Sequence, residues 1–71
     1  MSREAAKIVL DAVLRHAAEQ DTALIEIQAK CSPEEFKRYK QMIGKSMGAI
    51  FLEIVHPIVA QYPDLKPPQM K

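Results

Sequence analysis

The residue pair in this sequence best suited to chemistry is Glu53 and His56, which lie three positions apart. Helical bundles use this Glu-x-x-His spacing to hold metal ions in their interior. The motif occurs once per chain, so two copies would meet only in a dimer. The acidic residues of the N-terminal half fall on a predicted solvent face, so a metal-binding bundle is a remote alternative. We expect no cofactor and no bound metal.

The second histidine, His16, and the single cysteine, Cys31, are expected to play structural roles. A hairpin that turns near residue 31 places His16 and His56 at different levels, so the two rings cannot meet within one chain. Cys31 precedes a predicted helix N-terminus, a setting that can activate a thiol, but no histidine neighbours it in sequence. One cysteine excludes an internal disulfide and a cysteine-cluster zinc site within one chain.

Both glycines of the chain, Gly44 and Gly48, lie in the stretch GKSMG. Its Gly-Lys-Ser is similar to the end of a phosphate-binding loop, but that loop needs an earlier glycine where Tyr39 stands. No other nucleotide or nucleophile motif is present, so we expect no enzymatic activity. Four residues apart on a helix, the two glycines share one face. They predict a notch where another helix comes close, either the chain's own first helix or a second copy.

A basic segment lies around the predicted turn, although the whole chain has a formal charge of only +1. The near-neutral total argues against a general nucleic-acid binder. An aromatic residue among cations nevertheless suits stacked bases and phosphates, and Tyr39 lies in this segment. A nucleic-acid-binding regulator is therefore the alternative function, with Lys37, Arg38 and Lys40 as contacts. The basic residues are Lys30, Lys37, Arg38, Lys40 and Lys45.

Two long helices are predicted to position these residues. Ser32, Pro33 and Glu35 form a capping-box pattern, so the second helix begins at residue 33 and spans about 33–61. The first helix spans about 3–30, and charges of alternating sign mark its solvent face. One face of this helix repeats at steps of three and four, and we name it the seam. The seam residues are Ala6, Leu10, Val13, Ala17, Gln20, Leu24, Ile27 and Cys31.

The second helix is apolar around most of its circumference, which a two-helix hairpin cannot cover. Pro57 is expected to kink it, while the apolar spacing continues through Val59 without losing phase. We predict that its exposed stripe packs against a neighbouring helix, with a slight preference for a dimer partner. The predicted interface residues are Gly44, Met47, Gly48, Phe51, Leu52, Val55 and Val59.

The fold class predicted from these elements is all-α, an antiparallel two-helix hairpin over residues 1–62. A proline-rich, extended tail follows over residues 63–71. It could be a ligand for a proline-reading module or an arm lying over the partner chain, with Tyr62 and Leu65 as the residues that would dock. Two hairpins are expected to dimerise into a four-helix bundle. In outline, a short dimerising hairpin resembles the Rop-type RNA-binding regulator of plasmids, although no motif is shared and no residue is carried over.

The predicted function is a small non-enzymatic helical protein, a homodimeric protein-interaction or regulatory module that could also bind an unidentified protein partner. The apolar stretch from Met47 to Ala60 is shorter than the roughly 20 residues that span a bilayer. It is also interrupted by Glu53, His56 and Pro57. The N-terminus carries charges and no apolar run of the signal-peptide type. We therefore expect a cytoplasmic protein with no membrane partner.

Overall fold

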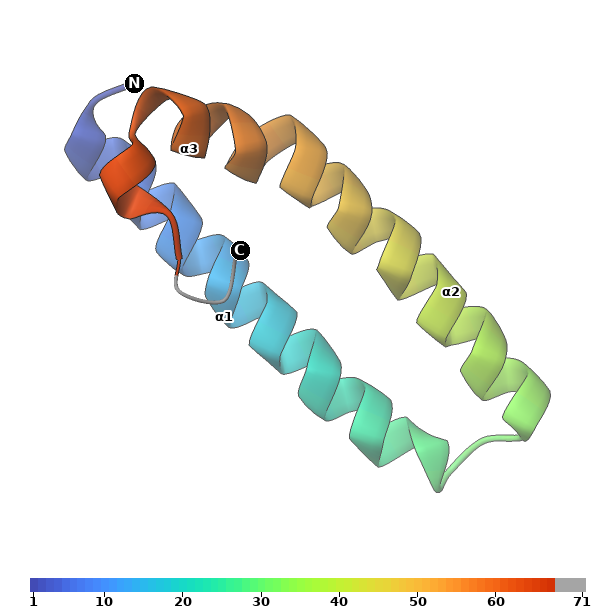
Figure 1. Cartoon of the computed structure of the whole chain (residues 1–71). Coiled ribbons are helices and arrows are strands. Elements are labelled where there is room, and N and C mark those ends of the chain that lie inside the picture. The colour runs from blue at the N-terminus through green and yellow to red at the C-terminus, as the bar shows by residue number, and fades with distance from the viewer. Residues whose placement is uncertain (68–71) are drawn as a thin grey trace.

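The computed structural model describes residues 1–67, and its long elements are helices, α1 (Arg3–Gln28), α2 (Pro33–Ile50) and α3 (His56–Gln61). A π-helical turn, η1 (Phe51–Val55), joins α2 to α3, and a 3-10 turn, η2 (Pro63–Leu65), follows α3. Together α2, η1 and α3 form one continuous rod that runs back along α1 (Figure 1). The predicted all-α helical hairpin is confirmed.

Both long helices begin at a serine cap. The Ser2 side chain accepts a hydrogen bond from the Ala5 N–H at 3.1 Å. At the second helix the Ser32 hydroxyl accepts from the Glu35 N–H, and the Glu35 carboxylate accepts from the Ser32 N–H, both at 3.2 Å. This reciprocal pair is the capping box that the sequence predicts. The first helix ends at Gln28, two residues earlier than expected.

The seam of α1 faces the second rod, since all eight of its residues are buried or half-buried. Its one polar member, Gln20, is explained by a partner on α2. The Tyr39 hydroxyl donates a hydrogen bond to Gln20 Oε1 at 2.9 Å. This bond pairs the Gln20 carbonyl oxygen with the Tyr39 hydroxyl where the two helices meet, and no buried side-chain N or O atom among the described residues lacks a partner.

The hydrophobic core lies at the end of the hairpin far from the turn. Among residues 1–67 the buried core consists of Ala6, Leu10, Val55 and Ile58, and Pro67 is buried as well. No residue of α2 is buried. The middle and the turn end of the hairpin are therefore held by half-buried side chains alone, so the chain itself leaves much of its apolar surface in water.

Pro57 is accommodated by the π-helical turn, and the kink expected there stays a prediction. A proline has no N–H to donate, and its ring crowds the carbonyl group four residues earlier. Just before it, the His56 N–H bonds to the Phe51 carbonyl, five residues back, which places an extra residue in that turn. The prediction that the apolar stripe keeps its phase is wrong. Val55 is 3% exposed and faces α1, whereas Ile54 is 39% exposed.

The segment from Tyr62 to Pro67 folds back over the start of α1, and we name it the strap. The sequence predicts an extended tail from residue 63, but Pro63–Leu65 instead form the 3-10 turn η2. Arg3 Nε donates to Asp64 Oδ2 at 2.9 Å, and the Tyr62 hydroxyl donates to the Met1 carbonyl. Tyr62 and Leu65 also pack against the core. The predicted tail beyond Pro67 lies outside the described residues.

The molecule is a thin rod measuring 44 × 20 × 17 Å. Its continuous helix over Pro33–Gln61 has 29 residues, and an 18-residue window in it has a mean hydropathy of 1.4 with 11% of the window buried. By length and composition alone this helix could cross a membrane. The expectation of no membrane helix rests on the length of the shorter stretch from Met47 to Ala60. Its premise on length therefore does not hold for the helix as folded.

Candidate functional site

Two shallow apolar grooves run along the hairpin, one on each side, where α1 meets the second rod. The first has a volume of about 210 Å³ and is closed at one end by Pro67 of the strap. Its lining is Leu10, Val13, Leu14, Ala17, Met47, Phe51, Val55 and Pro67. The second groove has about 330 Å³, and its lining is Ile8, Val9, Ala12, Val13, His16, Ile50 and Ile54. Neither lining contains a carboxylate, a lysine or an arginine.

The predicted glycine notch opens outward beside the first groove. A side-chain carbon added at Gly44 or Gly48 would meet no atom within 4 Å. The two glycines therefore do not pack against α1, which excludes one of the two neighbours considered for the notch. Of the other predicted interface residues, Phe51 is 41% exposed and Leu52 is 69% exposed. Met47 and Val59 are half-buried, and Val55 belongs to the core of its own chain.

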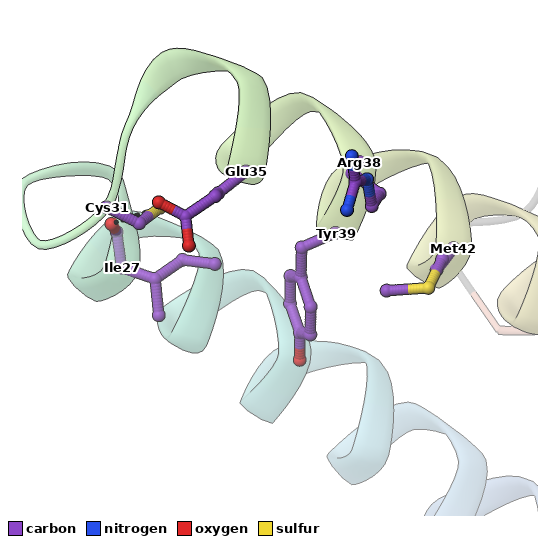
Figure 2. Close-up of a pocket in the computed structure, with 6 residues that line it drawn as sticks. All are labelled: Ile27, Cys31, Glu35, Arg38, Tyr39 and Met42. Carbon is purple, nitrogen blue, oxygen red and sulfur yellow. Dashed lines mark hydrogen bonds between the residues drawn. The ribbon is translucent and has the colours of Figure 1, made fainter.

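A third, more polar pocket of about 430 Å³ lies at the turn (Figure 2). Figure 2 shows its lining, Ile27, Cys31, Glu35, Arg38, Tyr39 and Met42. The Cys31 thiol donates to the Ile27 carbonyl at 3.0 Å, so a backbone acceptor holds it. Hydrogen bonds from the N–H and then the hydroxyl of Ser32 lower the pKa of the Glu35 carboxyl. Both groups thus have structural partners within the hairpin.

The basic residues near the turn are all exposed. Within residues 1–67 the one ion pair joins Arg3 and Asp64, so none of these five cations is held by a carboxylate there. They do not share one direction. Lys40 lines a groove with Asp21 on one side of the hairpin, whereas Arg38 lines the turn pocket on the other. The predicted contacts Lys37, Arg38 and Lys40 therefore spread around α2 instead of forming a single patch.

The metal hypothesis finds no support among the described residues. Glu53 and His56 are both exposed, and His16 lies farther along the other helix. No group of three or more His, Cys, Asp or Glu side chains within residues 1–67 is placed to hold a metal ion. A lone Glu-x-x-His without a third ligand leaves the coordination of a metal such as zinc largely to water.

Large apolar side chains outside the predicted interface are also exposed, among them Ile8, Ile25 and Met42. Ile8 and Ile25 are 64% and 74% exposed on α1, and Met42 is 52% exposed on α2. A signal for them was present in the sequence, because Ile8 and Ile25 fall outside the seam of α1. Apolar residues well away from the inward face of an amphipathic helix stay largely in water when only one partner helix is present. They indicate that the hairpin carries apolar surface on both of its helices.

Comparisons with family models, with curated proteins and with solved structures found no significant match. The function is therefore argued from the geometry of the chain.

Proposed function

We propose that this chain is a non-enzymatic helical module that acts as a homodimer, two hairpins packing into a four-helix bundle. The observation that carries the proposal is the amount of surface that the single chain leaves exposed. The hairpin has 5504 Å² of accessible surface. A monomeric globular protein of 8.0 kDa exposes about 4,450 Å². The excess of roughly 1,000 Å² is comparable to the area of about 800 Å² that each partner buries in a standard interface.

The shape of the chain supports the same proposal. Its radius of gyration is 14.4 Å, whereas a compact domain of this length would have about 11 Å. Four buried residues form a very small core, and chains below about 70–80 residues usually need staples or a partner for stability. No disulfide is available, since the chain has one cysteine. A second hairpin would supply the missing layer.

Sedimentation equilibrium of the purified full chain tests this proposal. We expect a mass of two chains at micromolar concentration, with dissociation on dilution accompanied by loss of helical circular dichroism. The loss follows because one hairpin buries too little apolar surface to offset the ordering of its backbone. A well-folded monomer across the same concentration range would overturn the proposal.

Nucleic-acid binding is the second candidate, and the observation that favours it is the set of cations without carboxylate partners among the described residues. A single-stranded RNA labelled with fluorescein would be titrated with the protein at several salt concentrations. We expect affinity to fall with salt, and the slope of its logarithm to become shallower when Lys37 and Arg38 are changed to alanine. No binding at low salt would exclude this candidate.

A further inference from the structure

The helical geometry divides the exposed apolar surface into two faces of different character. Met47 follows Gly44 by three residues on α2, and Phe51, the first residue of η1, follows Gly48 by three, so these four lie on one side of the rod. Met47 and Phe51 line the first groove together with Leu14 of α1, and Ala18 follows Leu14 by four residues. We name this surface the glycine face. Its residues are Leu14, Ala18, Gly44, Met47, Gly48 and Phe51.

None of the six residues of the glycine face is charged or titratable, and its charged neighbours on α2 include Lys45, three residues before Gly48, and Lys37, seven residues before Gly44. The opposite face differs at the same level, because His16 lines the second groove. Beyond α2, Glu53 of η1 adds an exposed carboxylate. Farther toward the turn, Arg38 and Glu35 precede Met42 by four and seven residues and line the pocket of Figure 2. Covering the opposite face would take charged side chains such as Arg38 out of water, which is costly.

Charges border the glycine face at both ends, and each end carries acidic and basic side chains, with Lys37 as a second base toward the turn because it precedes Gly44 by seven residues. Asp21 and Lys40 line the groove toward the turn. Toward the other end, Lys7 and Asp11 precede Leu14 by seven and three residues on α1. Both signs of charge are therefore available at each end of the face. Such balance suits a self-complementary, two-fold symmetric contact.

We propose that the glycine face is the surface on which a second copy of this chain docks. The inference rests on the proposed function and adds the location of the contact. The backbone at Gly44 and Gly48 is uncovered, so a partner helix can approach there more closely than side chains elsewhere allow. The strap already closes one end of the groove with Pro67, which leaves the central part for the partner.

Two neighbouring substitutions on α2 provide a matched test. Gly48→Glu places a carboxylate on the glycine face, and Ala49→Glu places the same group on the opposite side of the helix. Both positions are exposed in the single chain, and a side chain at residue 48 has open space around it. Glutamate is also a better helix former than glycine. Circular dichroism of each variant at high concentration would report whether its helices remain.

By sedimentation equilibrium we expect Gly48→Glu to weaken the dimer at least about 30-fold, because an unpaired carboxylate becomes buried, and Ala49→Glu to change it less than about threefold. A dimeric wild type with an unaffected Gly48→Glu variant would overturn the choice of face and leave the homodimer intact. Equal weakening by both variants would also overturn it.

A monomeric wild type would overturn both the homodimer and the choice of face. Flotation with phosphatidylcholine vesicles then tests whether a lipid bilayer covers the apolar surface instead. A wild-type monomer that floats with the vesicles would show that a bilayer covers the apolar surface of the long second helix. A dimer that stays in the aqueous fractions supports the proposal.

Discussion

Ser32 and Glu35 determine where the second helix begins, because each side chain accepts a hydrogen bond from the backbone N–H of the other. Gln20 and Tyr39 perform a similar local function between the helices, where one hydrogen bond removes the cost of two polar groups in an apolar seam. The capping box joins residues three apart, a spacing that can be seen in the sequence, whereas Gln20 and Tyr39 lie on different helices. The capping box was therefore predictable, while the Tyr39 partner of Gln20 required the packed hairpin.

At the first of these residues, Ser32→Ala is expected to lower the free energy of unfolding by about 1 kcal/mol, because the Glu35 N–H loses its acceptor. Urea denaturation followed by circular dichroism would measure the change. Ser46→Ala serves as the control, since Ser46 is exposed in the interior of α2 and alanine is the better helix former there. If both substitutions lower stability equally, the cap does not stabilise the helix.

The capping box also predicts a dependence of stability on pH. The pKa of Glu35 is lowered in the folded chain, so its charged form stabilises the fold. That stabilisation is complete above the ordinary pKa of glutamate and is lost as pH falls through the lowered, folded-state pKa. Urea unfolding at a series of acidic pH values should show a smaller loss for Glu35→Gln than for the wild type. Identical slopes for the two proteins would contradict the role of the carboxylate.

Among the elements, the π-helical turn has the largest effect on which side chains face α1. The sequence predicted both helices, the short turn between them and the seam of α1, because caps and apolar spacing are local signals. It did not predict that Val55 replaces Ile54 on the inner face. Near Pro57 the backbone could form an α-helical turn or a π-helical turn with one more residue, and the structure has the π-helical turn. The apolar residues of this stretch are compatible with both, so their spacing does not distinguish them.

This change of phase can be tested with two adjacent alanine substitutions. Val55→Ala should destabilise the fold by about 2 kcal/mol, because Val55 is 3% exposed within the core. Ile54→Ala should cost less than about 1 kcal/mol although it removes more carbon atoms, since Ile54 is 39% exposed. Thermal unfolding at one fixed protein concentration would compare them. The reverse order would mean that the rod is α-helical through Pro57.

For the whole molecule, the central fact is that one hairpin forms a single layer. The interface residues named from the sequence lie mostly on its surface, with Val55 as the exception that the π-helical turn draws into the core. The sequence could indicate that α2 has more apolar surface than α1 covers. The sequence could not indicate which face of the hairpin has fewer charges. That comparison requires knowing which residues of α1 lie next to which residues of α2.

Stacking two hairpins face to face should hardly change the radius of gyration of the particle. The radius of gyration of the chain is 14.4 Å, and layers at the usual helix spacing of 8–10 Å would raise it by only about 1 Å. Small-angle X-ray scattering would therefore show twice the mass at nearly constant radius. An end-to-end dimer of 44 Å rods would give a far larger radius, and that result would contradict a four-helix bundle.

The single cysteine at the turn allows the relative direction of two hairpins in a dimer to be measured. Cys31 lies at one end of a rod 44 Å long, so a nitroxide attached to its thiol marks the direction of each chain. In a dimer, two hairpins pointing the same way would bring the two spin labels together. Two hairpins pointing in opposite directions would hold the labels apart by nearly the full length of the rod. The distance between the two spin labels thus shows whether the hairpins of the dimer point the same way or in opposite directions.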